Sequence, residues 1–408
     1  MQKSLSLGVF DVVVIGGGVI GTSTAYALIK TGLSVALLER GGIATGTSGR
    51  CDGNVLIADK GLGYDMLLNK ASLDLFPIIE NELDYDIQWR QRGCMIVAEN
   101  EVEMQMCTEL CSNIRAHGYD VHMLNKEETL TREPCLSQDI AGSMESMPDG
   151  SLNPMALCQG LAQGFARLGG KIFLNTEVIS IGTDSSGSIE SVHTSRGKIT
   201  TNAVVACAGV GTRRIGQMLN LNIPIEPRQG QILVAEKSIY VASRKVMEFG
   251  YMAAKFGDTA YKRNATPEME EFGTALVFEP TEAGNFLIGS SRSFKGKSTQ
   301  SHRICLRSIA QRALRFFPVL ENIKVIRSYS GLRPYTPDHL PIISATEVPG
   351  FFVGAGHEGD GIGLSLITGK LLSEIVTGRP PSMDVKPLAF SRFSGKEVRP
   401  SPFALQVS

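Results

Sequence analysis

The chain has 408 residues, 43% of them hydrophobic, and its 40 lysines and arginines nearly balance its 41 aspartates and glutamates. This balance gives a formal charge of −1 and no general electrostatic attraction to nucleic acid, so we expect no nucleic-acid partner. No apolar run approaches the roughly 18 residues that span a bilayer, and we expect no transmembrane segment.

The first predicted element is a strand, Val12–Ile15, which runs into a turn containing Gly16, Gly18 and Gly21. The next apolar run ends at Glu39, and the chain between them predicts a helix. In such a unit the first glycine permits a tight turn, the second admits a pyrophosphate to the backbone, and the third lets the helix pack on the strand. The helix offers free N–H groups to the anion, and the acid suits a ribose. The pattern therefore predicts a bound dinucleotide.

The stretch after Glu39 helps to distinguish an FAD site from an NAD site, the two common kinds of dinucleotide site. Arg40 is followed by a long loop, residues 41–54, which is rich in glycine, serine and threonine. Such a loop lays N–H and hydroxyl donors along a second stretch of pyrophosphate, whereas an NAD site more often resumes a helix directly after the second strand. The sequence therefore favours FAD.

The following part of the chain predicts a mixture of helices and short strands. Residues 64–83 have helical spacing that Pro77 interrupts, and residues 101–117 form a charged amphipathic pattern. Pro154 suits the first position of the next helix. That helix is predicted over 155–168, and strands are predicted at 87–90, 93–97, 171–174, 177–181 and 203–206.

Residues 223–327 contain several strands and one helix, at 301–317, and predict a β-rich second domain. The chain then returns with a strand at 351–354 and a helix at 361–376, so the cofactor domain is discontinuous. The predicted fold class is α/β (α+β overall), a discontinuous Rossmann-like FAD-binding domain with an inserted β-rich substrate domain. We assign residues 1–90, 150–220 and 325–380 to the FAD-binding domain, 91–149 and 221–324 to the substrate domain, and the proline-rich residues 381–408 to an extended C-terminal tail.

The eight cysteines are scattered, and none forms a Cys-x-x-Cys pair. We therefore expect no metal or iron–sulfur site built by this chain. No signal-peptide pattern precedes the glycine turn, and ordinary thiols suit a reducing compartment, so we expect a cytoplasmic protein.

Several motifs, in order along the chain, resemble those of a known family. They are the opening glycine turn, the strand end at residues 205–209, Gly-Leu-Arg-Pro-Tyr-Thr-Pro-Asp at 331–338, and Gly-Ala-Gly-His-Glu-Gly-Asp-Gly-Ile at 354–362. The chain resembles the FAD-dependent D-amino-acid, glycine and sarcosine oxidase (DAO) family from residue 10 to about 380. Residues 278–280 and 356–362 look most like the flavin subunits of heteromeric dye-linked dehydrogenases. These include the β subunits of D-hydroxyproline dehydrogenase and opine oxidase, and the C subunit of hydrogen cyanide synthase.

The resemblance implies how FAD is held. The three glycines of the turn match the pyrophosphate site, Glu39 the adenosine ribose acid, and Val178 a strand residue whose backbone meets the adenine. Residues 356–362 match a loop and helix start at the flavin pyrimidine edge, where a helix N-terminus would stabilise negative charge on the reduced ring. Covalent members carry a cysteine where this chain has Gly331, so we expect non-covalent FAD. The full implied set is Gly16, Gly18, Gly21, Glu39, Arg40, Thr47, Ser48, Gly53, Asn54, Val178, Gly209, Gly331, Gly356, Gly359, Asp360, Gly361 and Ile362.

Three residues are predicted to act on the substrate. Arg333 matches an arginine that binds the substrate carboxylate in this family, and its fork suits two carboxylate oxygens. His357 follows a glycine turn, where either a base or a hydrogen-bonding group is expected. Tyr251, like Tyr261, lies in the inserted domain and is a candidate to cap the substrate pocket.

The leading functional hypothesis is oxidation of the C–N bond of a small amino acid or N-substituted amino acid, such as glycine, D-hydroxyproline, a sarcosine-like compound or an opine. The resemblance implies hydride transfer from Cα to flavin N5, which gives an imine without requiring a side-chain base. A second hypothesis is a flavin electron-transfer subunit, active only with partner subunits that carry further redox cofactors and placed at the membrane periphery through them. An NAD(P)-dependent dehydrogenase ranks third.

Overall fold

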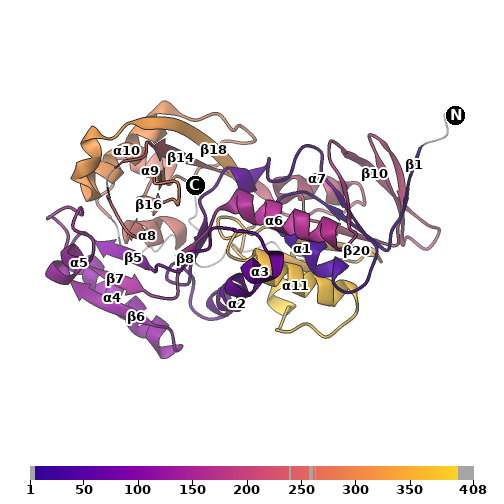
Figure 1. Ribbon diagram of the computed structural model, residues 1–408, viewed down its shortest axis with the longest axis horizontal. Coiled ribbons are helices and arrows are strands. Elements are labelled where there is room, and N and C mark those ends of the chain that lie inside the picture. The colour runs from indigo at the N-terminus through magenta and orange to yellow at the C-terminus, as the bar shows by residue number, and fades with distance from the viewer. Residues whose placement is uncertain (1–4, 239, 257–260, 262, 394–408) are drawn as a thin grey trace.

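The computed structural model describes residues 5–238, 240–256, 261 and 263–393 of the chain. It has two lobes, each built around one large sheet (Figure 1). The first lobe contains the N-terminal strands and helices α1, α6 and α11, and the second contains β5–β7 and β14–β18.

The first lobe is centred on a six-stranded sheet whose strands are parallel except for the edge strand β19. All four residues of β2 are buried, as are all four of β3, because both faces of this sheet are covered. The order is β19 (Ile342–Ala345), β20 (Phe351–Ala355), β13 (Ala203–Ala206), β2 (Val12–Ile15), β3 (Val35–Leu38) and β9 (Lys171–Phe173).

Two different layers cover the two faces of this sheet. Val12 and Val14 join the core formed with helices α1 (Val19–Ile29), α6 (Pro154–Arg167) and α11 (Ser365–Val376). Val13 and Ile15 join the core formed with a four-stranded sheet. The alternation follows from the two-residue period of a strand. The four-stranded sheet has the order β1 (Ser6–Val9), β12 (Gly197–Thr200), β11 (Ile189–Thr194) and β10 (Val178–Thr183).

The second lobe is centred on an eight-stranded sheet, in which β15 and β5 are parallel and the other neighbours antiparallel. Helix α10 (Arg303–Phe316) packs on it through a core rich in phenylalanine. The sheet order is β18 (Val325–Tyr335), β14 (Glu226–Ala235), β17 (Phe286–Gly289), β16 (Val277–Pro280), β15 (Lys245–Glu248), β5 (Cys94–Ala98), β7 (Gly142–Ser146) and β6 (Val121–Asn125).

The remaining elements connect the lobes or lie on their surfaces. The helices are α2 (Tyr64–Leu73), α3 (Phe76–Leu83), α4 (Glu101–Ala116), α5 (Lys126–Arg132), α7 (Thr212–Gln217), α8 (Gly250–Phe256) and α9 (Pro267–Phe272). A two-stranded sheet pairs β4 (Asn54–Val55) with β8 (Gly150–Ser151), and the 3-10 turns are η1 (Thr47–Gly49), η2 (Gly209–Gly211), η3 (Pro318–Asn322), η4 (Lys386–Leu388) and η5 (Phe390–Phe393).

The predicted α/β class is confirmed, and several local predictions are corrected. Residues 64–83 form two helices, and Pro77 lies in the first turn of the second, where its missing N–H is tolerated. The predicted strand at 87–90 is wrong apart from one bridge, from Arg90 to Ser151. Strand β18, which the sequence boundary at residue 325 assigns to the first domain, pairs with β14 in the second sheet. Part of the predicted tail, residues 394–408, lies outside the described residues.

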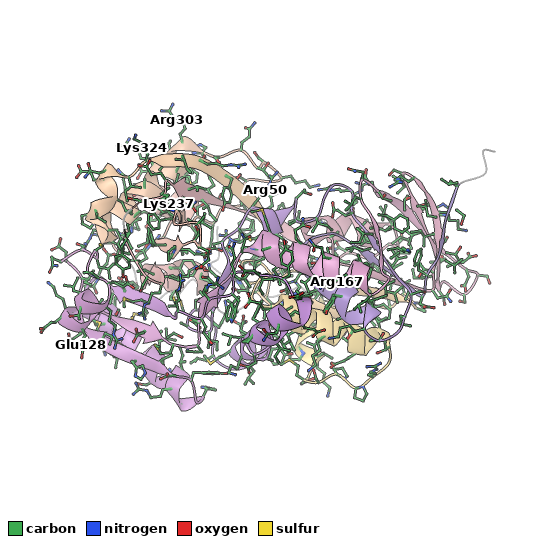
Figure 2. The ribbon with its side chains drawn as sticks, in the orientation of Figure 1. Arg50, Glu128, Arg167, Lys237, Arg303 and Lys324 are labelled. Atoms are coloured by element: carbon green, nitrogen blue, oxygen red, sulfur yellow. The ribbon has the colours of Figure 1, made fainter. Side chains whose placement is uncertain are left out.

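Side chains project outward from both lobes, and the labelled charged residues include Arg167 on the first lobe and Glu128 on the second (Figure 2). Arg303 and Lys324 lie on the outer side of the second lobe, whereas Arg50 lies where the two lobes meet. Among the described residues, we find no helix with the length and apolar character that a membrane crossing requires.

Candidate active site

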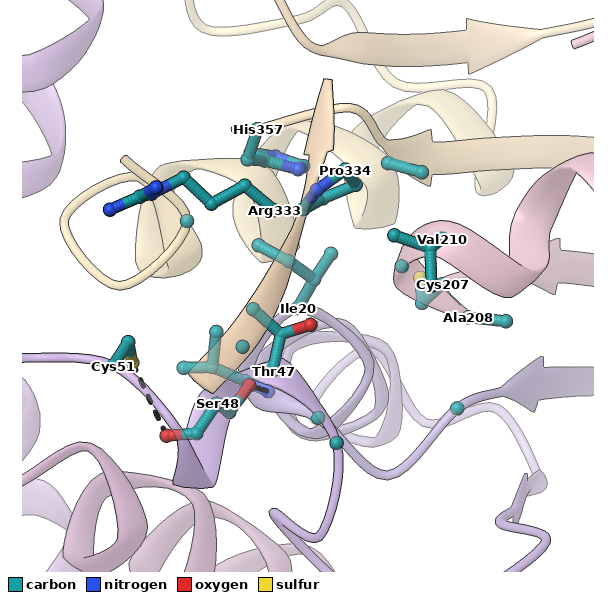
Figure 3. Close-up of a pocket in the computed structure, with 18 of the residues that line it drawn as sticks. Ile20, Thr47, Ser48, Cys51, Cys207, Ala208, Val210, Arg333, Pro334 and His357 are labelled. Atoms are coloured by element: carbon teal, nitrogen blue, oxygen red, sulfur yellow. Dashed lines mark hydrogen bonds between the residues drawn. The ribbon is translucent and has the colours of Figure 1, made fainter. Parts of the chain in front are cut away.

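One cavity runs from the carboxyl end of the first sheet to the edge strand β18 and its neighbour β14 in the second. The glycine turn, the loop after β3 and the end of β13 line it at one end (the nucleotide end). The loop after β20, Tyr251, Gly230 and Arg333 line it at the other (the substrate end). In Figure 3 the Arg333 side chain extends away from Cys207, Ala208 and Val210. The cavity therefore joins the two predicted sites.

The glycine turn has the tight geometry that the sequence predicts. Gly16 has φ +119°, and a Cβ there would lie 2.4 Å from the Cys207 carbonyl oxygen. A Cβ on Gly21 would lie 1.8 Å from the Gly16 carbonyl oxygen, so this glycine lets helix α1 meet the turn. Gly16 and Gly18 line the cavity, and Gly21 does not. The turn thus presents bare backbone at the N-terminus of α1, where an anion binds well.

Glu39 lies beside this turn, where the sequence places a ribose ligand. Its carboxylate accepts the amide protons of Gly17 and Gly41, each at 2.7 Å, and it lines the cavity. Arg40, Val178 and Gly209 line the same end. Because two backbone amides fix the carboxylate, its remaining lone pairs are held in position for hydroxyl donors.

The loop of residues 41–54, which carries the hydroxyls of Thr47 and Ser48, connects the two lobes at the cavity wall. Ser48 Oγ accepts the Val19 amide proton at 3.0 Å, which caps the first turn of α1. The Thr47 hydroxyl donates to the Leu332 carbonyl oxygen at 2.7 Å, next to Arg333. Both residues line the cavity. Gly331 lines it too, and a Cβ there would lie 2.8 Å from the Arg50 carbonyl oxygen.

Gly53 and Asn54 have different positions, although the sequence groups them. The Gly53 amide donates to Glu279 at 3.0 Å, and a Cβ would lie 1.7 Å from the Leu152 carbonyl oxygen, so Gly53 is fixed behind the wall rather than lining it. Burial raises the pKa of Glu279 to about 7. Asn54 lines the cavity, and within the described part of the chain its buried Oδ1 has no hydrogen-bond partner.

The loop after β20 brings His357 to the cavity but begins its helix later than predicted. Helix α11 starts at Ser365, not at residue 361, and residues 361–364 form turns. Gly361 and Gly363 explain the delay, because glycine disfavours the helical conformation. Gly356 has φ +84° and packs against Thr336 outside the cavity lining. The other predicted residues of this loop, Gly359, Asp360, Gly361 and Ile362, do line it.

His357 is buried and held in one tautomer. The Thr368 hydroxyl donates its proton to the Leu364 carbonyl oxygen at 2.7 Å, so it accepts the Nε2–H of His357 at 2.9 Å. Nδ1 is then a bare acceptor, and it has no partner among the described residues. Burial lowers the pKa of His357 to about 3, so the ring is neutral near neutral pH.

Asp360 belongs to a buried ion cluster that the sequence does not reveal. Lys60, only 4% exposed, pairs with Asp59 at 2.7 Å and with Asp360. Lys255 pairs with Asp59 at 3.0 Å and with Asp360 at 3.3 Å. Although burial opposes it, the two lysines hold the pKa of Asp59 well below its ordinary value. The carboxylate of Asp360 therefore joins α8 and the segment after β4 to the loop after β20.

Arg333 projects from β18 across Gly230 of β14. Its Nη1 donates to the Ser291 carbonyl oxygen at 2.7 Å. A Cβ on Gly230 would lie 2.3 Å from that nitrogen, so only glycine leaves room for the guanidinium. Within the described residues Arg333 forms no ion pair with a carboxylate. Burial, and then the nearby Arg292, lower its pKa. Arg333 is evident from the sequence motif, whereas Gly230 becomes evident only in the structure.

The two tyrosines of the inserted domain differ. Tyr251 lines the cavity, and the Arg292 guanidinium lies 4.2 Å from its ring centroid. Tyr261 donates its hydroxyl proton to Glu103 of α4 and does not line the cavity. Arg292 carries no sequence motif, so the structure alone reveals it.

These features fit a bound dinucleotide. The glycine turn leaves no side chain between the backbone and the cavity, and Glu39 is positioned beside it. Asn54 Oδ1 and His357 Nδ1 are buried acceptors without partners in the described ranges, and a ligand that donates hydrogen bonds would satisfy both. Arg333 is the cation at the far end.

Comparisons with known proteins agree with this geometry. Residues 11–375 match the family model described as FAD dependent oxidoreductase. The chain is 28% identical to a glycine oxidase of Geobacillus kaustophilus, over 95% of this chain and 98% of that one. It is 29% identical to an opine oxidase subunit of Rhizobium meliloti, over 86% and 89%. The crystal structure of the Geobacillus kaustophilus glycine oxidase superposes with a TM-score of 0.85 at 27% identity, covering 95% of this chain and 100% of that one.

Proposed function

Because the chain belongs to the family of FAD-dependent oxidoreductases, we propose that it oxidises the C–N bond of a small amino acid or N-substituted amino acid to an imine. Its cofactor is FAD, and the family match removes the NAD(P)-dependent alternative. The observation that carries the proposal is Arg333, a cation at the end of the cavity with no carboxylate partner among the described residues. A substrate carboxylate would supply that partner.

We assign the holding of FAD to the nucleotide end and the neighbouring walls. The amides of the glycine turn and the N-terminus of α1 would bind the pyrophosphate, and Glu39 would accept from the adenosine ribose. Asn54 Oδ1 and His357 Nδ1 would accept hydrogen bonds along the cavity. Bound FAD supplies the hydride acceptor and hence the oxidising power. The chain offers glycine at residue 331, which supports non-covalent binding.

Arg333 would orient the substrate. The Ser291 carbonyl oxygen holds one nitrogen of the guanidinium, and the absent side chain of Gly230 lets the group lie flat on β14. A planar fork held in this way can bind both oxygens of a carboxylate, which fixes the direction of the adjoining Cα–H. The residue thus contributes position and charge rather than proton transfer.

His357 would hold a hydrogen bond rather than remove a proton. Its Nε2–H is engaged by Thr368, and its pKa of about 3 makes it a weak base. A neutral ring also adds no further positive charge beside Arg333. We therefore assign no side-chain base, and the substrate amine would enter uncharged. Tyr251, at the cavity wall, would cover the substrate.

A second candidate function is supported by the similarity to the opine oxidase chain of Rhizobium meliloti, whose name marks it as one subunit of an enzyme. In this alternative the protein binds FAD and turns over only with partner subunits. Co-purification of other chains at fixed stoichiometry, together with no turnover by the isolated chain, would favour it.

The test is an anaerobic titration of the purified flavoprotein, followed by flavin absorbance. The substrates are glycine, D-proline, cis-4-hydroxy-D-proline, sarcosine and an opine. We expect one of them to bleach the flavin, and air then separates an oxidase, which recolours quickly, from a dehydrogenase, which recolours slowly. If none bleaches the flavin, amine oxidation by the isolated chain is wrong.

A further inference from the structure

Two arginines lie at the substrate end: Arg333 lines the cavity, and the guanidinium of Arg292 lies on the ring of Tyr251, which also lines it. In the register of β14 and β18, Gly230 lies opposite Gly331 and Arg228 opposite Arg333. On the other side of β14, Gln229 bridges Ser293 in antiparallel fashion, which places Arg292 opposite Gly230. Side chains directly opposite each other in an antiparallel sheet share a face. Arg292 and Arg333 therefore project from the same face, on either side of a floor without side chains.

That floor belongs to the cavity. Gly230 and Gly331 both line it, as do Tyr251 and Arg333. The Arg292 guanidinium lies on the Tyr251 ring, and the carbonyl oxygen of the preceding residue, Ser291, binds Arg333. The Arg333 guanidinium covers Gly230, and the Arg292 guanidinium lies beside it, on Tyr251, at the wall where substrate is expected.

Arg292 is buried without a carboxylate partner in the part of the chain that the structure describes. It is 8% exposed, and its buried Nη1 has no hydrogen-bond partner among the described residues. Its guanidinium makes no ion pair with any carboxylate in the same ranges, and its ring contact with Tyr251 supplies no negative charge. A buried cation is costly unless it is paired, so a cation in this condition suits a site that an anion enters.

Two neighbouring arginines of the same lobe have carboxylate partners. Arg228 projects from the same face as Arg333 and pairs with Glu358, whose other oxygen meets His339 at 3.0 Å. Arg263 pairs with Glu248 at 3.6 Å and donates from Nη2 to the Thr274 carbonyl oxygen. Its Nη1, like that of Arg292, has no hydrogen-bond partner among the described residues, so in charge pairing the two arginines differ in the carboxylate alone. The described chain thus supplies a carboxylate to these two arginines and none to Arg292 or Arg333. The two unpaired guanidiniums call for two negative charges from a ligand.

We propose that the substrate carries two carboxylates, with Arg333 binding the carboxylate next to the carbon that is oxidised and Arg292 binding the second. This inference rests on the proposed function and narrows it to an amino dicarboxylate. The second carboxylate is carried either on the amine substituent, as in an N-(carboxyalkyl) amino acid, or on the side chain.

The test uses the FAD-loaded protein and two thioethers that contain no amine. Methylthioacetate has one carboxylate, and 2,2′-thiodiacetate has the same skeleton with a second. Binding is followed by the change in flavin absorbance at pH 8, where both carboxylates are charged. A charge-assisted hydrogen bond at Arg292 should make thiodiacetate bind about 10- to 100-fold more tightly.

Variants test whether Arg292 causes the preference for thiodiacetate over methylthioacetate. In Arg292→Gln the ratio of the two dissociation constants should fall towards one, and in Arg292→Lys it should be intermediate. Arg263→Gln is the matched control, because it removes another buried arginine that has its own carboxylate partner, and it should keep the wild-type ratio. If Arg292→Gln weakens both ligands equally, the two arginines clamp one carboxylate, and the proposal is overturned.

The wild-type ratio decides the proposal even if the Arg292 variants fold poorly, because equal affinity for the two thioethers overturns it. Anaerobic bleaching of the flavin by sarcosine, iminodiacetate and aspartate tests amine oxidation independently of thioether binding. Bleaching by iminodiacetate would place the second carboxylate on the amine substituent, and bleaching by aspartate would place it on the side chain. Bleaching by sarcosine alone, with equal thioether affinities, would leave amine oxidation standing and remove the second subsite. Tight thiodiacetate binding without bleaching by any amine would keep the subsite and remove amine oxidation.

Discussion

The two ends of the cavity are built in opposite ways. At the nucleotide end the main features come from one short stretch of chain, Gly16 to Glu39, and act through backbone amides and missing side chains. At the substrate end, side chains far apart in sequence meet, such as Lys60 with Asp360, and Arg333 with the backbone of Ser291. The first end is fixed by local geometry, and the second by the docking of two lobes. Mutations at the nucleotide end should therefore reduce the FAD content, and mutations at the substrate end should reduce kcat/KM while FAD stays bound.

The largest effect is expected at the nucleotide end, from Gly21→Ala. The new Cβ would lie 1.8 Å from the Gly16 carbonyl oxygen, and because that atom belongs to the backbone no flexible side chain can move aside. We expect essentially complete loss of bound FAD, measured as the ratio of flavin to protein absorbance. Gly61→Ala is the control, because Gly61 does not line the cavity and its Cβ would meet only the Asp65 side chain, at 3.7 Å. Full flavin content in Gly21→Ala would contradict this account of the turn.

At the substrate end, Arg333→Gln should lower kcat/KM by about 100-fold or more and leave the flavin content unchanged. Losing a carboxylate partner of this kind costs about 2–5 kcal/mol, and each 1.4 kcal/mol is a factor of ten. Arg333→Lys should recover part of the loss, since it keeps the charge but not the fork. Steady-state kinetics on the substrate identified by bleaching provide the measurement. If Arg333→Gln loses FAD but keeps its affinity for the substrate, Arg333 binds the cofactor and not the substrate.

The same contrast explains what the sequence can and cannot predict. The glycine turn, Glu39 and the strands around them follow from spacing within one βαβ unit, and the FAD prediction is confirmed. Asp360 and Arg333 are found only through resemblance to a family. Lys60, Lys255 and Arg292 have no local signal, because a charged residue looks exposed until another lobe covers it. The periodicity places the start of α11 too early because two glycines delay the helix.

A smaller effect is expected from Gly230→Ala, which tests whether β14 positions Arg333. The Cβ would lie 2.3 Å from Arg333 Nη1, but that atom is the end of a flexible side chain and can move. We expect normal folding and flavin content, with KM raised about 10-fold through the displaced fork. Gly359→Ala places a Cβ at an ordinary 3.5 Å from Arg333 Nε and should raise KM less. If the two variants raise KM equally, Gly230 does not determine the position of the Arg333 guanidinium.

The smallest effect on turnover is expected from His357→Asn, and its pH dependence is the informative part. Burial holds the folded pKa of His357 at about 3, against an ordinary value of 6.5, so the unfolded chain binds more protons between these values. Wild-type stability should therefore rise from pH 3 to about 6.5 and gain nothing from this residue above that range. At pH 5 the burial of His357 costs about 2 kcal/mol relative to pH 8, since each pKa unit is worth 1.36 kcal/mol. His357→Asn should remove this pH dependence of stability, which is measured by urea unfolding at pH 5 and pH 8. Because the asparagine Oδ1 can replace Nδ1 as a hydrogen-bond acceptor, kcat/KM should change less than about threefold. A lost ionisation near pH 6–7 in the kcat profile would instead make His357 a base, and the substrate end would then depend on proton transfer as well as on position and charge.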